Sequence, residues 1–346
     1  MKHLLEPFVL RYPSLMVLCA FLGASAEASE LDRAAQTKLR VASYNVYWGS
    51  VFPPDDGQPP LPEGRKSIDD RREQFLRVHS AVSPDIWALQ EVLYGDEQRR
   101  TKTVAGIRRY FSEATGEEWH VAADERGRLV LSRYPIVWSE EIVTRVFAVL
   151  VDVPPSVADR DVLLLNVHFG GGWGESMRSA RTAARFLRRV ERGEVGEVPR
   201  DVTTILCGDF NSKSDGQPYR VVRSLDPDVP QKGDLDWLME DVHPRHLDFD
   251  SDATIGAVEF DGDERSVVGR RIDFFLYRSD HLHSTNQFIF NTLVLDDERL
   301  SRHGLRRNDT AVDPNDKLEG TVGFDHLPLV VDFAANSAGE KDDPAP

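Results

Sequence analysis

Short apolar runs recur along the chain, and most of them are bounded by Gly, Pro, Asn or Asp. Runs of this length, with alternating or continuous apolar character, are typical of β-strands that pack into a core. The dipeptide Tyr134-Pro135 separates two of these runs by a turn. We predict strands at 38–48, 85–90, 118–123, 128–132, 141–153, 161–168, 202–207, 271–278, 287–295 and 327–333.

Three segments have helical periodicity instead. The first has a capping-box-like start at Ser67 and Asp70 and ends before Pro84. The second covers 99–114 and the third covers 176–192. The third helix has an apolar face (Ala180, Ala183, Ala184, Leu187, Val190) and an arginine face (Arg178, Arg181, Arg185, Arg188, Arg192). Strands therefore outnumber helices, and several helices connect strands.

Residues 1–28 have the features of a secretory signal peptide. Lys2 and Arg11 precede a short apolar run, and small residues with an A-x-A pattern follow it up to Ala28. The apolar run is too short to cross a bilayer as a helix. We therefore expect a secreted or periplasmic protein, with an uncleaved N-terminal anchor as the alternative.

Composition and charge limit the class of protein. The chain has 346 residues, of which 40% are hydrophobic and 29% charged, and its formal net charge is −16. This composition is globular, and the charge argues against tight, salt-sensitive gripping of a nucleic-acid backbone. It does not exclude attack on a phosphoester if metal ions supply positive charge. Because no Gly/Ser-rich linker divides the chain, we predict one α/β domain over 38–335, a disordered tail over 336–346, and a monomer without a stable protein partner.

Cysteine usage excludes two kinds of site. Once Cys19 leaves with the signal peptide, only Cys207 remains, so no intramolecular disulfide can form. Cys207 ends an apolar run, and we interpret it as a buried strand residue. The sequence contains no C-x-x-C or H-E-x-x-H motif, which excludes thiolate-rich zinc sites.

Polar side chains with chemical potential gather where the apolar strands end. One such residue usually caps or turns the chain, but this many strand ends favour a shared rim. The residues are Asn45, Glu91, His168, Asp209, Asn211, Asp273, Asp325 and His326.

These positions fall in motifs that resemble the endonuclease/exonuclease/phosphatase superfamily, the metal-dependent phosphoesterases related to pancreatic deoxyribonuclease. The matching stretches are VASYNVYWG, DIWALQEV, LVLSRYPI, LLNVHF, ILCGDFNS, RRIDFFLY and FDHLPLVVDF, in the family's order. They span residues 40–333. The resemblance implies an α/β (α+β) fold, a four-layer sandwich of two mostly antiparallel sheets flanked by helices, with the active site at one end.

The resemblance also implies a divalent-cation site. Asn45 and Glu91 match the family's metal positions, and Asp325 matches a further acidic position beside them. Mg²⁺ favours oxygen donors and near-octahedral geometry, which a carboxylate and an amide oxygen suit, and Mn²⁺ is an alternative. The ion would neutralise phosphate oxygens and stabilise the leaving alkoxide.

The remaining matches imply acid–base and phosphate-binding roles. Asp209 matches the residue that orients or deprotonates the attacking water, and Asn211 matches a donor to the phosphoryl oxygens. Asp273 and His326 match a hydrogen-bonded acid–imidazole pair that suits a general base. His168 matches a phosphate-contacting residue with a general-acid role.

Departures from the subfamily patterns leave the substrate open. Tyr47 stands where abasic-site nucleases carry an acid, those nucleases lack a histidine at the His168 position, and Arg271 begins an R-I-D triplet unlike the inositol 5-phosphatase pattern. Phe324 replaces the usual serine before the final Asp-His. Deoxyribonuclease-like, sphingomyelinase-like and other phosphoesterase activities remain, with a nucleic acid, a phospholipid or a small phosphoester as substrate. A non-catalytic binding protein on the same fold is a remote alternative, because no predicted catalytic position is degenerate.

Three further residues are candidates for substrate binding. Trp173 could contact a base or lipid from the loop 169–175, although packing against a sheet edge is the alternative. Arg181 could meet a phosphate or make a structural ion pair, within an arginine face that is usually solvated. Arg306 lies in the long connection 296–323, which could line the substrate cleft.

The segment 248–259, DFDSDATIGAVE, resembles a calcium-binding EF-hand loop in the spacing of Asp248, Asp250, Asp252 and Glu259. Ala253 stands where such loops need Gly, and Pro244 breaks the helix that should precede the loop. We therefore predict an acidic surface loop, with a structural Ca²⁺ site as the alternative.

Overall fold

The computed structural model describes residues 31–46, 51–52, 71–92, 103–143, 145–228, 238–247, 250–261, 264–310 and 325–336. The predicted signal peptide and the predicted tail beyond Asn336 lie outside these residues. In the described part of the chain, no helix is both long and apolar enough to cross a membrane.

Two sheets form the centre of the molecule. The seven-stranded sheet has the order β10-β14-β15-β1-β2-β4-β3, and the six-stranded sheet has the order β5-β6-β7-β8-β13-β9. The first contains β1 Leu39–Asn45, β2 Ile86–Gln90, β3 His120–Ala123, β4 Leu129–Ser132, β10 Arg245–His246, β14 Leu282–Ile289 and β15 Leu329–Ala335. The second contains β5 Ile136–Val143, β6 Val146–Val151, β7 Val162–His168, β8 Thr203–Asp209, β9 Glu240–Asp241 and β13 Asp273–Arg278.

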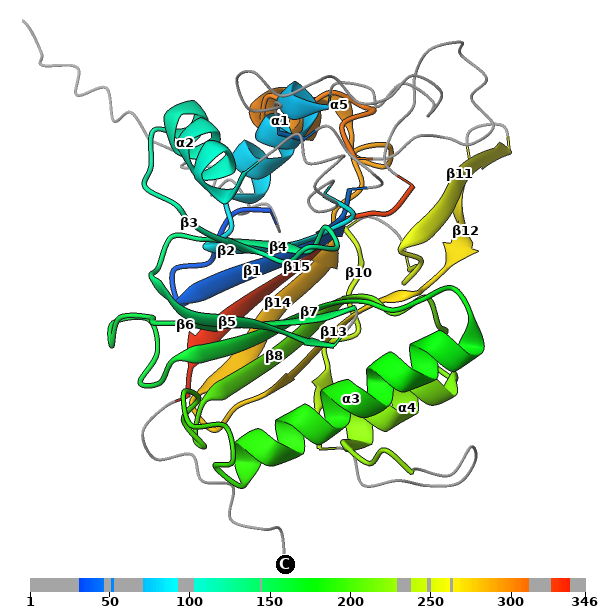
Figure 1. Cartoon of the computed structure of the whole chain (residues 1–346). Helices are drawn as coiled ribbons and strands as arrows, with labels where there is room; N and C mark the ends of the chain where they lie inside the picture. The colour runs from blue at the N-terminus through cyan, green and yellow to red at the C-terminus, as the bar shows by residue number, and fades with distance from the viewer. Residues whose placement is uncertain are drawn as a thin grey trace, which may run out of the picture.

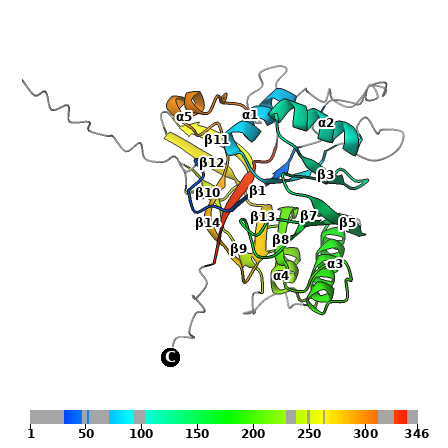
Figure 2. The same ribbon diagram turned by 90° about the vertical axis from the view of Figure 1, so that its left-hand side faces the viewer.

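Helices cover the outer face of each sheet, which gives four layers (Figure 1). Helices α1 (Arg72–Val82), α2 (Val104–Thr115) and α5 (Asp297–Arg302) lie over the seven-stranded sheet, and α3 (Trp173–Glu191) and α4 (Gln217–Ser224) lie over the other. The turned view in Figure 2 shows the same separation of the two helical layers. Of the strand pairs in the described residues, only β1–β2, β7–β8 and the short β10–β14 pair are parallel, so the predicted mostly antiparallel sandwich is confirmed.

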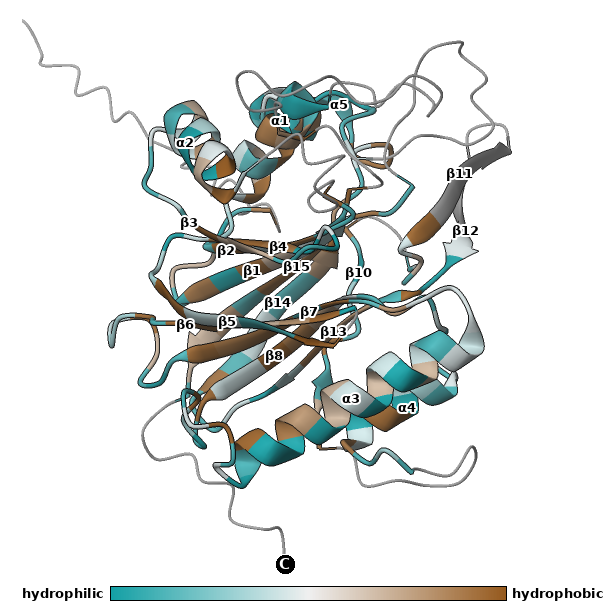
Figure 3. Cartoon of the chain, in the orientation of Figure 1, coloured by the Kyte–Doolittle hydropathy of each residue, from teal (hydrophilic) through white to brown (hydrophobic). Residues whose placement is uncertain are grey.

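Apolar side chains fill the space between the layers. Val41, Ile86, Leu164, Ile205 and Val331 are fully buried in the cluster between the two sheets. Figure 3 shows hydrophobic positions along these inner strands and hydrophilic ones on the outer turns of α3. The predicted apolar face of α3 is buried against the six-stranded sheet, whereas Arg178 and Arg185 are exposed.

A buried ion pair joins the first and last strands. Arg40 on β1 faces Asp332 on β15, and its Nε and Nη2 donate to the two carboxylate oxygens at 2.6 and 2.7 Å. Its Nη1 also donates to the carbonyls of Leu31 and Val82, so the guanidinium is well satisfied. An Arg fork on a carboxylate is a strong, directional link.

Several predicted boundaries were wrong. The strand predicted at 141–153 is a hairpin of β5 and β6, because half-exposed β5 has weak apolar patterning. The strand predicted at 287–295 ends at Ile289. Helix α3 begins at Trp173, inside the segment 169–175 that was predicted as a loop, and not at residue 176. The hairpin of β11 (Ile255–Asp261) and β12 (Glu264–Arg270), which was not predicted, extends beyond the two sheets (Figure 1).

Candidate active site

Strand direction brings the predicted site residues to one end of the sandwich. β1 and β2 run parallel, so Asn45 and Glu91 lie together where these strands end. β7 and β8 also run parallel, and His168 is in register with Asp209. β13 runs antiparallel to β8, so its first residue, Asp273, faces Asp209.

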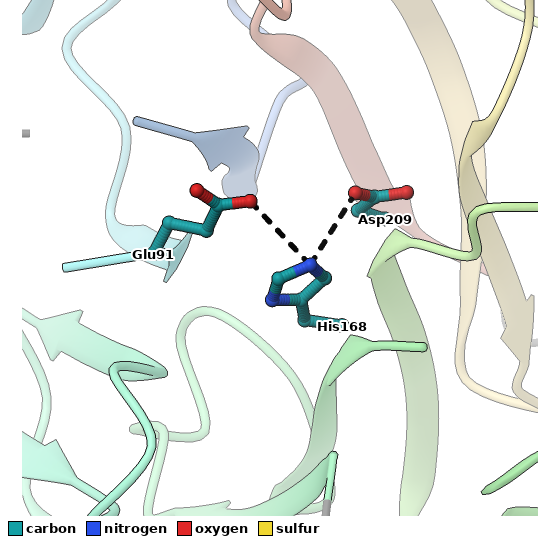
Figure 4. Close-up of side chains that lie close together, drawn as sticks. All are labelled: Glu91, His168 and Asp209. Carbon is teal, nitrogen blue, oxygen red and sulfur yellow. Dashed lines mark ion pairs between the residues drawn. The ribbon is translucent and has the colours of Figure 1, made fainter. Parts of the chain in front are cut away.

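The first group of side chains joins the two sheets. Asn45 Nδ2 donates to Glu91 Oε1 at 3.0 Å and to Asp209 Oδ2 at 3.2 Å. The imidazole of His168 points between the two carboxylates, with Nε2 3.5 Å from Glu91 Oε1 and 3.7 Å from Asp209 Oδ2 (Figure 4). One potential ligand atom from each of Glu91, His168 and Asp209 lies within 4.8 Å of the others.

The second group is the predicted acid–imidazole pair. His326 Nδ1 lies 2.8 Å from Asp273 Oδ2, and both side chains are buried. Thr254 ties the two chain segments together: its hydroxyl accepts from the Asp273 amide at 3.1 Å and its carbonyl accepts from the Leu327 amide at 2.9 Å. His326 Nε2 then faces Asp209 Oδ2 at 3.8 Å, so the pair adjoins the first group.

Backbone geometry at the strand ends is unusual. Glu91 and Asn211 have φ of 58° and 47°, a left-handed conformation that Asn tolerates better than Glu. Asn211 is fixed there because its Nδ2 donates to Phe169 O at 2.9 Å and its amide N donates to Asp209 Oδ1 at 2.7 Å. Gly208 has φ of 135°, and a Cβ there would lie 2.0 Å from the carbonyl oxygen of Val167, so only glycine fits.

Burial and neighbouring charges change the pKa values of Asp209 and His326. Burial, followed by the charges of Asp273 and Glu91, raises the pKa of Asp209. Burial alone would lower the pKa of His326, but the charges of Asp273 and Asp209 outweigh it and raise that pKa. His326 is therefore protonated near neutral pH in this state, which suits a hydrogen-bond or proton donor better than the predicted general base.

His168 has the opposite behaviour. Burial, followed by the charges of Arg145 and Arg128, lowers the pKa of His168 to about 3, so its imidazole is neutral near pH 7. Its contacts with Glu91 and Asp209 are then polar contacts longer than a hydrogen bond.

Arg145 was missed by the sequence analysis. It follows the β5 strand with φ of 82°, its carbonyl accepts from the His168 amide at 3.2 Å, and its Nε pairs with Glu175 at 2.6 Å. Its side chain is partly exposed. In the sequence, Arg145 is a single cation in a turn between two apolar runs, which does not by itself indicate a site. The pairing of β6 with β7 places this turn beside His168.

The structure does not bring all predicted residues into this group. Asp325 is half-exposed, with Oδ1 3.9 Å from His326 Nε2, and burial raises its pKa. Arg181 donates to the carbonyl of Pro227 at 2.9 Å, a structural contact but not the ion pair considered above. Arg306 is exposed, and its backbone amide donates to Asp309. Trp173 is 65% exposed, which contradicts the alternative that it packs against a sheet edge.

The acidic segment 248–259 is not one loop. Ile255–Asp261 form strand β11, so the loop prediction was wrong for the second half of the segment. Asp250 pairs with Arg245, and Asp248 lies outside the described residues. The potential metal-ligand groups in the described part of the chain are Glu91, His168 and Asp209, and Asp209, Asp273 and His326. Neither includes a residue of this segment.

The donors around Asp209 suit a divalent cation. Glu91 and Asp209 supply carboxylate oxygens, which Mg²⁺ and Mn²⁺ both accept. Burial, then the charge of Asp273 and, to a smaller extent, the charge of Glu91 raise the pKa of Asp209, and a bound cation would offset these charges. Asn45 directs its Nδ2 at both carboxylates, so its amide must turn over for the oxygen to become a ligand.

Comparison with known proteins defines the class. The profile of the Endonuclease/Exonuclease/phosphatase family matches residues 42–303, and the chain belongs to this family. Members of the family are generally metal-dependent hydrolases of phosphoesters.

Solved structures show the same fold at low sequence identity. The chain is similar to an endonuclease/exonuclease/phosphatase family protein from Leptotrichia buccalis, with TM-score 0.51, 12% identity, and 86% and 100% of the two chains covered. It is also similar to the human Nocturnin catalytic domain with bound sulfate anion, with TM-score 0.51, 15% identity, and 86% and 93% covered. A family protein from Bacteroides thetaiotaomicron gives TM-score 0.50, 15% identity, and 86% and 95% covered. Comparison with curated protein sequences gave no match.

Proposed function

We propose that this protein is an exported, divalent-cation-dependent hydrolase that cleaves phosphodiester bonds with a water molecule. The observation that carries the proposal is the convergence of Asn45, Glu91, His168 and Asp209 from both sheets beside the Asp273–His326 pair. Family membership supports the same chemistry. A non-catalytic binding role would not require two carboxylates to be held together against their repulsion.

Glu91 and Asp209 would hold the cation, with Asn45 beside them. When bound, a divalent cation supplies charge neutralisation at the phosphate oxygens and at the leaving oxygen. Mg²⁺ is our first choice and Mn²⁺ the second.

The residues of the chain have distinct tasks in this proposal. Asp209, which lies between Asn45 and His326, can orient the attacking water beside the cation. The protonated His326, held by Asp273, can donate a hydrogen bond or a proton to a phosphoryl oxygen. The Asn211 side chain donates to Phe169 O and Asp209 Oδ2, so it would have to exchange one of these acceptors for a phosphoryl oxygen to bind the substrate.

Arg145 would add the positive charge that an anionic substrate requires. It is partly exposed beside His168, and Glu175 pairs with it. A substrate phosphate can replace Glu175 as its partner. Because the chain as a whole carries a charge of −16, such local cations matter for binding a phosphodiester.

A hydrolysis panel tests the activity. Bis-p-nitrophenyl phosphate, DNA, RNA, sphingomyelin and inositol phosphates are each incubated with Mg²⁺, Mn²⁺ or Ca²⁺, and with a chelator. We expect chelator-sensitive turnover of bis-p-nitrophenyl phosphate and of at least one natural phosphodiester, and its loss in Asp209→Asn. Absence of turnover with every cation, or turnover that survives both the chelator and Asp209→Asn, would contradict the proposal.

Export has its own test. The proposal rests on the sequence of residues 1–28, which lie outside the described part of the structure. Mass spectrometry of the protein expressed with its full N-terminus should find a mature chain that begins just after Ala26 or Ala28 in the extracytoplasmic fraction. A chain that keeps residues 1–28 and stays in the cytoplasm would contradict export.

A further inference from the structure

The two halves of the candidate site stand on different sheets. Asn45 and Glu91 come from β1 and β2, whereas His168 and Asp209 come from β7 and β8. Among the described residues the two sheets share no strand pair, so no backbone ladder there fixes the distance between these halves. Side chains between the sheets must set it.

The side chains between the two sheets change from apolar to polar close to the candidate site. Two residues before His168, at the inward position after Leu164, strand β7 carries Asn166. Its neighbour in this layer is Gln90, the last residue of β2, and Gln90 also donates to Ser43 of β1. Asn166 and Gln90 are fully buried, so unsatisfied polar atoms would be costly here.

Asn166 spans the gap between the sheets. Its Nδ2 donates to the carbonyl of Leu89 at 2.9 Å and to the carbonyl of Leu129 at 3.0 Å. Its Oδ1 accepts from Gln90 Nε2 at 2.8 Å. Leu89 and Leu129 face each other on β2 and β4. The side-chain amide of Asn166, on the six-stranded sheet, therefore hydrogen-bonds to two strands of the seven-stranded sheet.

These hydrogen bonds between the sheets lie close to the strand ends that carry the candidate site. Leu89 is two residues before Glu91, and Asn166 is two residues before His168. Because the amide is planar and uses both of its donor hydrogens across the sheets, it resists sliding as well as separation. We propose that Asn166 is a positioning residue that sets the separation of Glu91 from His168 and Asp209, and so the cation affinity of the site.

The effect on cation affinity rests on the proposed function. The positioning of the two halves of the site by Asn166 can be tested without cation or substrate. Asn166→Leu keeps the approximate shape of the side chain and removes all three hydrogen bonds. In its crystal structure without cation, we expect the Asn45–Asp209 and Glu91–His168 contacts, now 3.2 and 3.5 Å, to lengthen. Unchanged contacts would overturn the inference whatever the protein catalyses.

Cation affinity gives the second measurement, by isothermal titration calorimetry with Mn²⁺ alone. Partners that orient metal ligands typically change affinity by about 10–100-fold, and we expect a loss in this range for Asn166→Leu. The matched control is Leu164→Ala, one inward position down the same strand, which should lose stability and keep its affinity. Equal affinities in wild type, Asn166→Leu and Leu164→Ala would overturn the inference. If wild type itself binds no Mn²⁺, the proposed function fails. The crystal structure of Asn166→Leu alone then decides whether Asn166 sets the separation of the two halves of the site.

A double variant separates positioning from stability. Asn166→Leu leaves Gln90 Nε2 without its 2.8 Å acceptor, and adding Gln90→Leu removes that buried donor. The thermal midpoint should then recover in part, because both partners have become apolar. Mn²⁺ affinity should stay low, since the ties to Leu89 and Leu129 are still missing. Recovery of affinity together with stability would show that Asn166 is only structural. If Asn166→Leu does not fold, Asn166→Ala, which removes the same hydrogen bonds without burying a charge, takes its place.

Discussion

Asp273 and His326 are 53 positions apart in the sequence, yet Asp273 Oδ2 lies 2.8 Å from His326 Nδ1. The contact forms because β13 begins opposite the end of β8, and because Thr254 binds both the start of β13 and the segment that carries His326. The carboxylate fixes the tautomer of the imidazole and favours its protonated form. His326 Nε2 is thereby directed toward Asp209 as a donor.

The first prediction concerns this pair. His326→Ala should lower kcat/KM by about 10²–10⁴-fold, the usual range for an acid–base group. Asp273→Asn should lose much of the same factor, because the imidazole is then less basic and free to turn. The double variant should lose little more than His326→Ala, since both changes disable one unit. Losses that multiply in the double variant, with circular dichroism unchanged, would show that the two residues act independently.

Glu91→Gln should separate cation binding from folding. The change keeps the size of the side chain and removes one charge from the carboxylate group around Asp209, so the cation-free protein should melt at the same or a higher temperature. Mn²⁺ affinity should fall by at least about 100-fold, because a direct ligand matters more than an orienting partner. The stabilisation by added cation should vanish with it. Glu117→Gln, on the surface, is the matched control. Wild-type affinity in Glu91→Gln would exclude Glu91 as a ligand.

Arg145→Met should weaken substrate binding. Hydrogen bonds to charged groups contribute about 1.5–3 kcal/mol, so KM should rise by roughly 10–150-fold with a smaller change in kcat. Arg160→Met is a control, since Arg160 lies before the first residue of β7, away from His168, and pairs with Asp201. Steady-state kinetics at low and high salt would measure both. Equal KM values for the two variants would remove Arg145 from the binding surface.

His79 should make the protein less stable in acid. Burial lowers the pKa of His79 to about 4, and its Nδ1 accepts from Trp87 Nε1 at 3.1 Å. Between pH 6.5 and 4 the unfolded chain takes up a proton that the folded protein does not. The free energy of unfolding should therefore fall as the pH drops through this window, by up to about 3 kcal/mol from this residue. Urea unfolding of His79→Gln should show a slope about one proton smaller there. An unchanged slope would contradict the assignment.

Breaking the Arg40–Asp332 pair should cost more stability than removing it entirely. Arg40→Met leaves the carboxylate of Asp332 buried without its main partner, and we expect a loss of about 3–5 kcal/mol in the free energy of unfolding. Arg40→Met combined with Asp332→Leu should lose less, because no uncompensated charge remains. Urea denaturation measures both variants. A double variant less stable than Arg40→Met would show that packing, not charge compensation, dominates this site.

The four layers were predicted from the resemblance of the motifs to a known family, and most strands from the apolar runs. The number of polar residues directly after apolar runs, such as Glu91 and Asp209, indicated one rim, and the strand pairings place these residues there. The role of Arg145 could not be read in this way, since its place depends on a turn between two paired strands. Asn166 looked like one polar residue inside an apolar strand, and only the distance between the sheets gives it a partner.

Local composition also predicts the wrong structure where tertiary packing decides it. The glycines before Trp173 predicted a loop, yet α3 begins at Trp173 because its inner face can pack on the six-stranded sheet from there onward. The acidic run at 248–259 resembled a metal loop, but its second half pairs with β12. In both cases nonlocal contacts overrode residue preference.

The position of β15 has a consequence for how the chain folds. β15 lies between β1 and β14 in the seven-stranded sheet, although β1 and β15 are nearly 300 residues apart. The centre of that sheet therefore cannot close until the last strand has left the ribosome. Contacts of such high contact order slow folding, and incomplete chains expose an unpaired edge of β1. Nascent chains that lack β15 should thus depend on chaperones, whereas those that contain it gain the sheet and His326 in the same step.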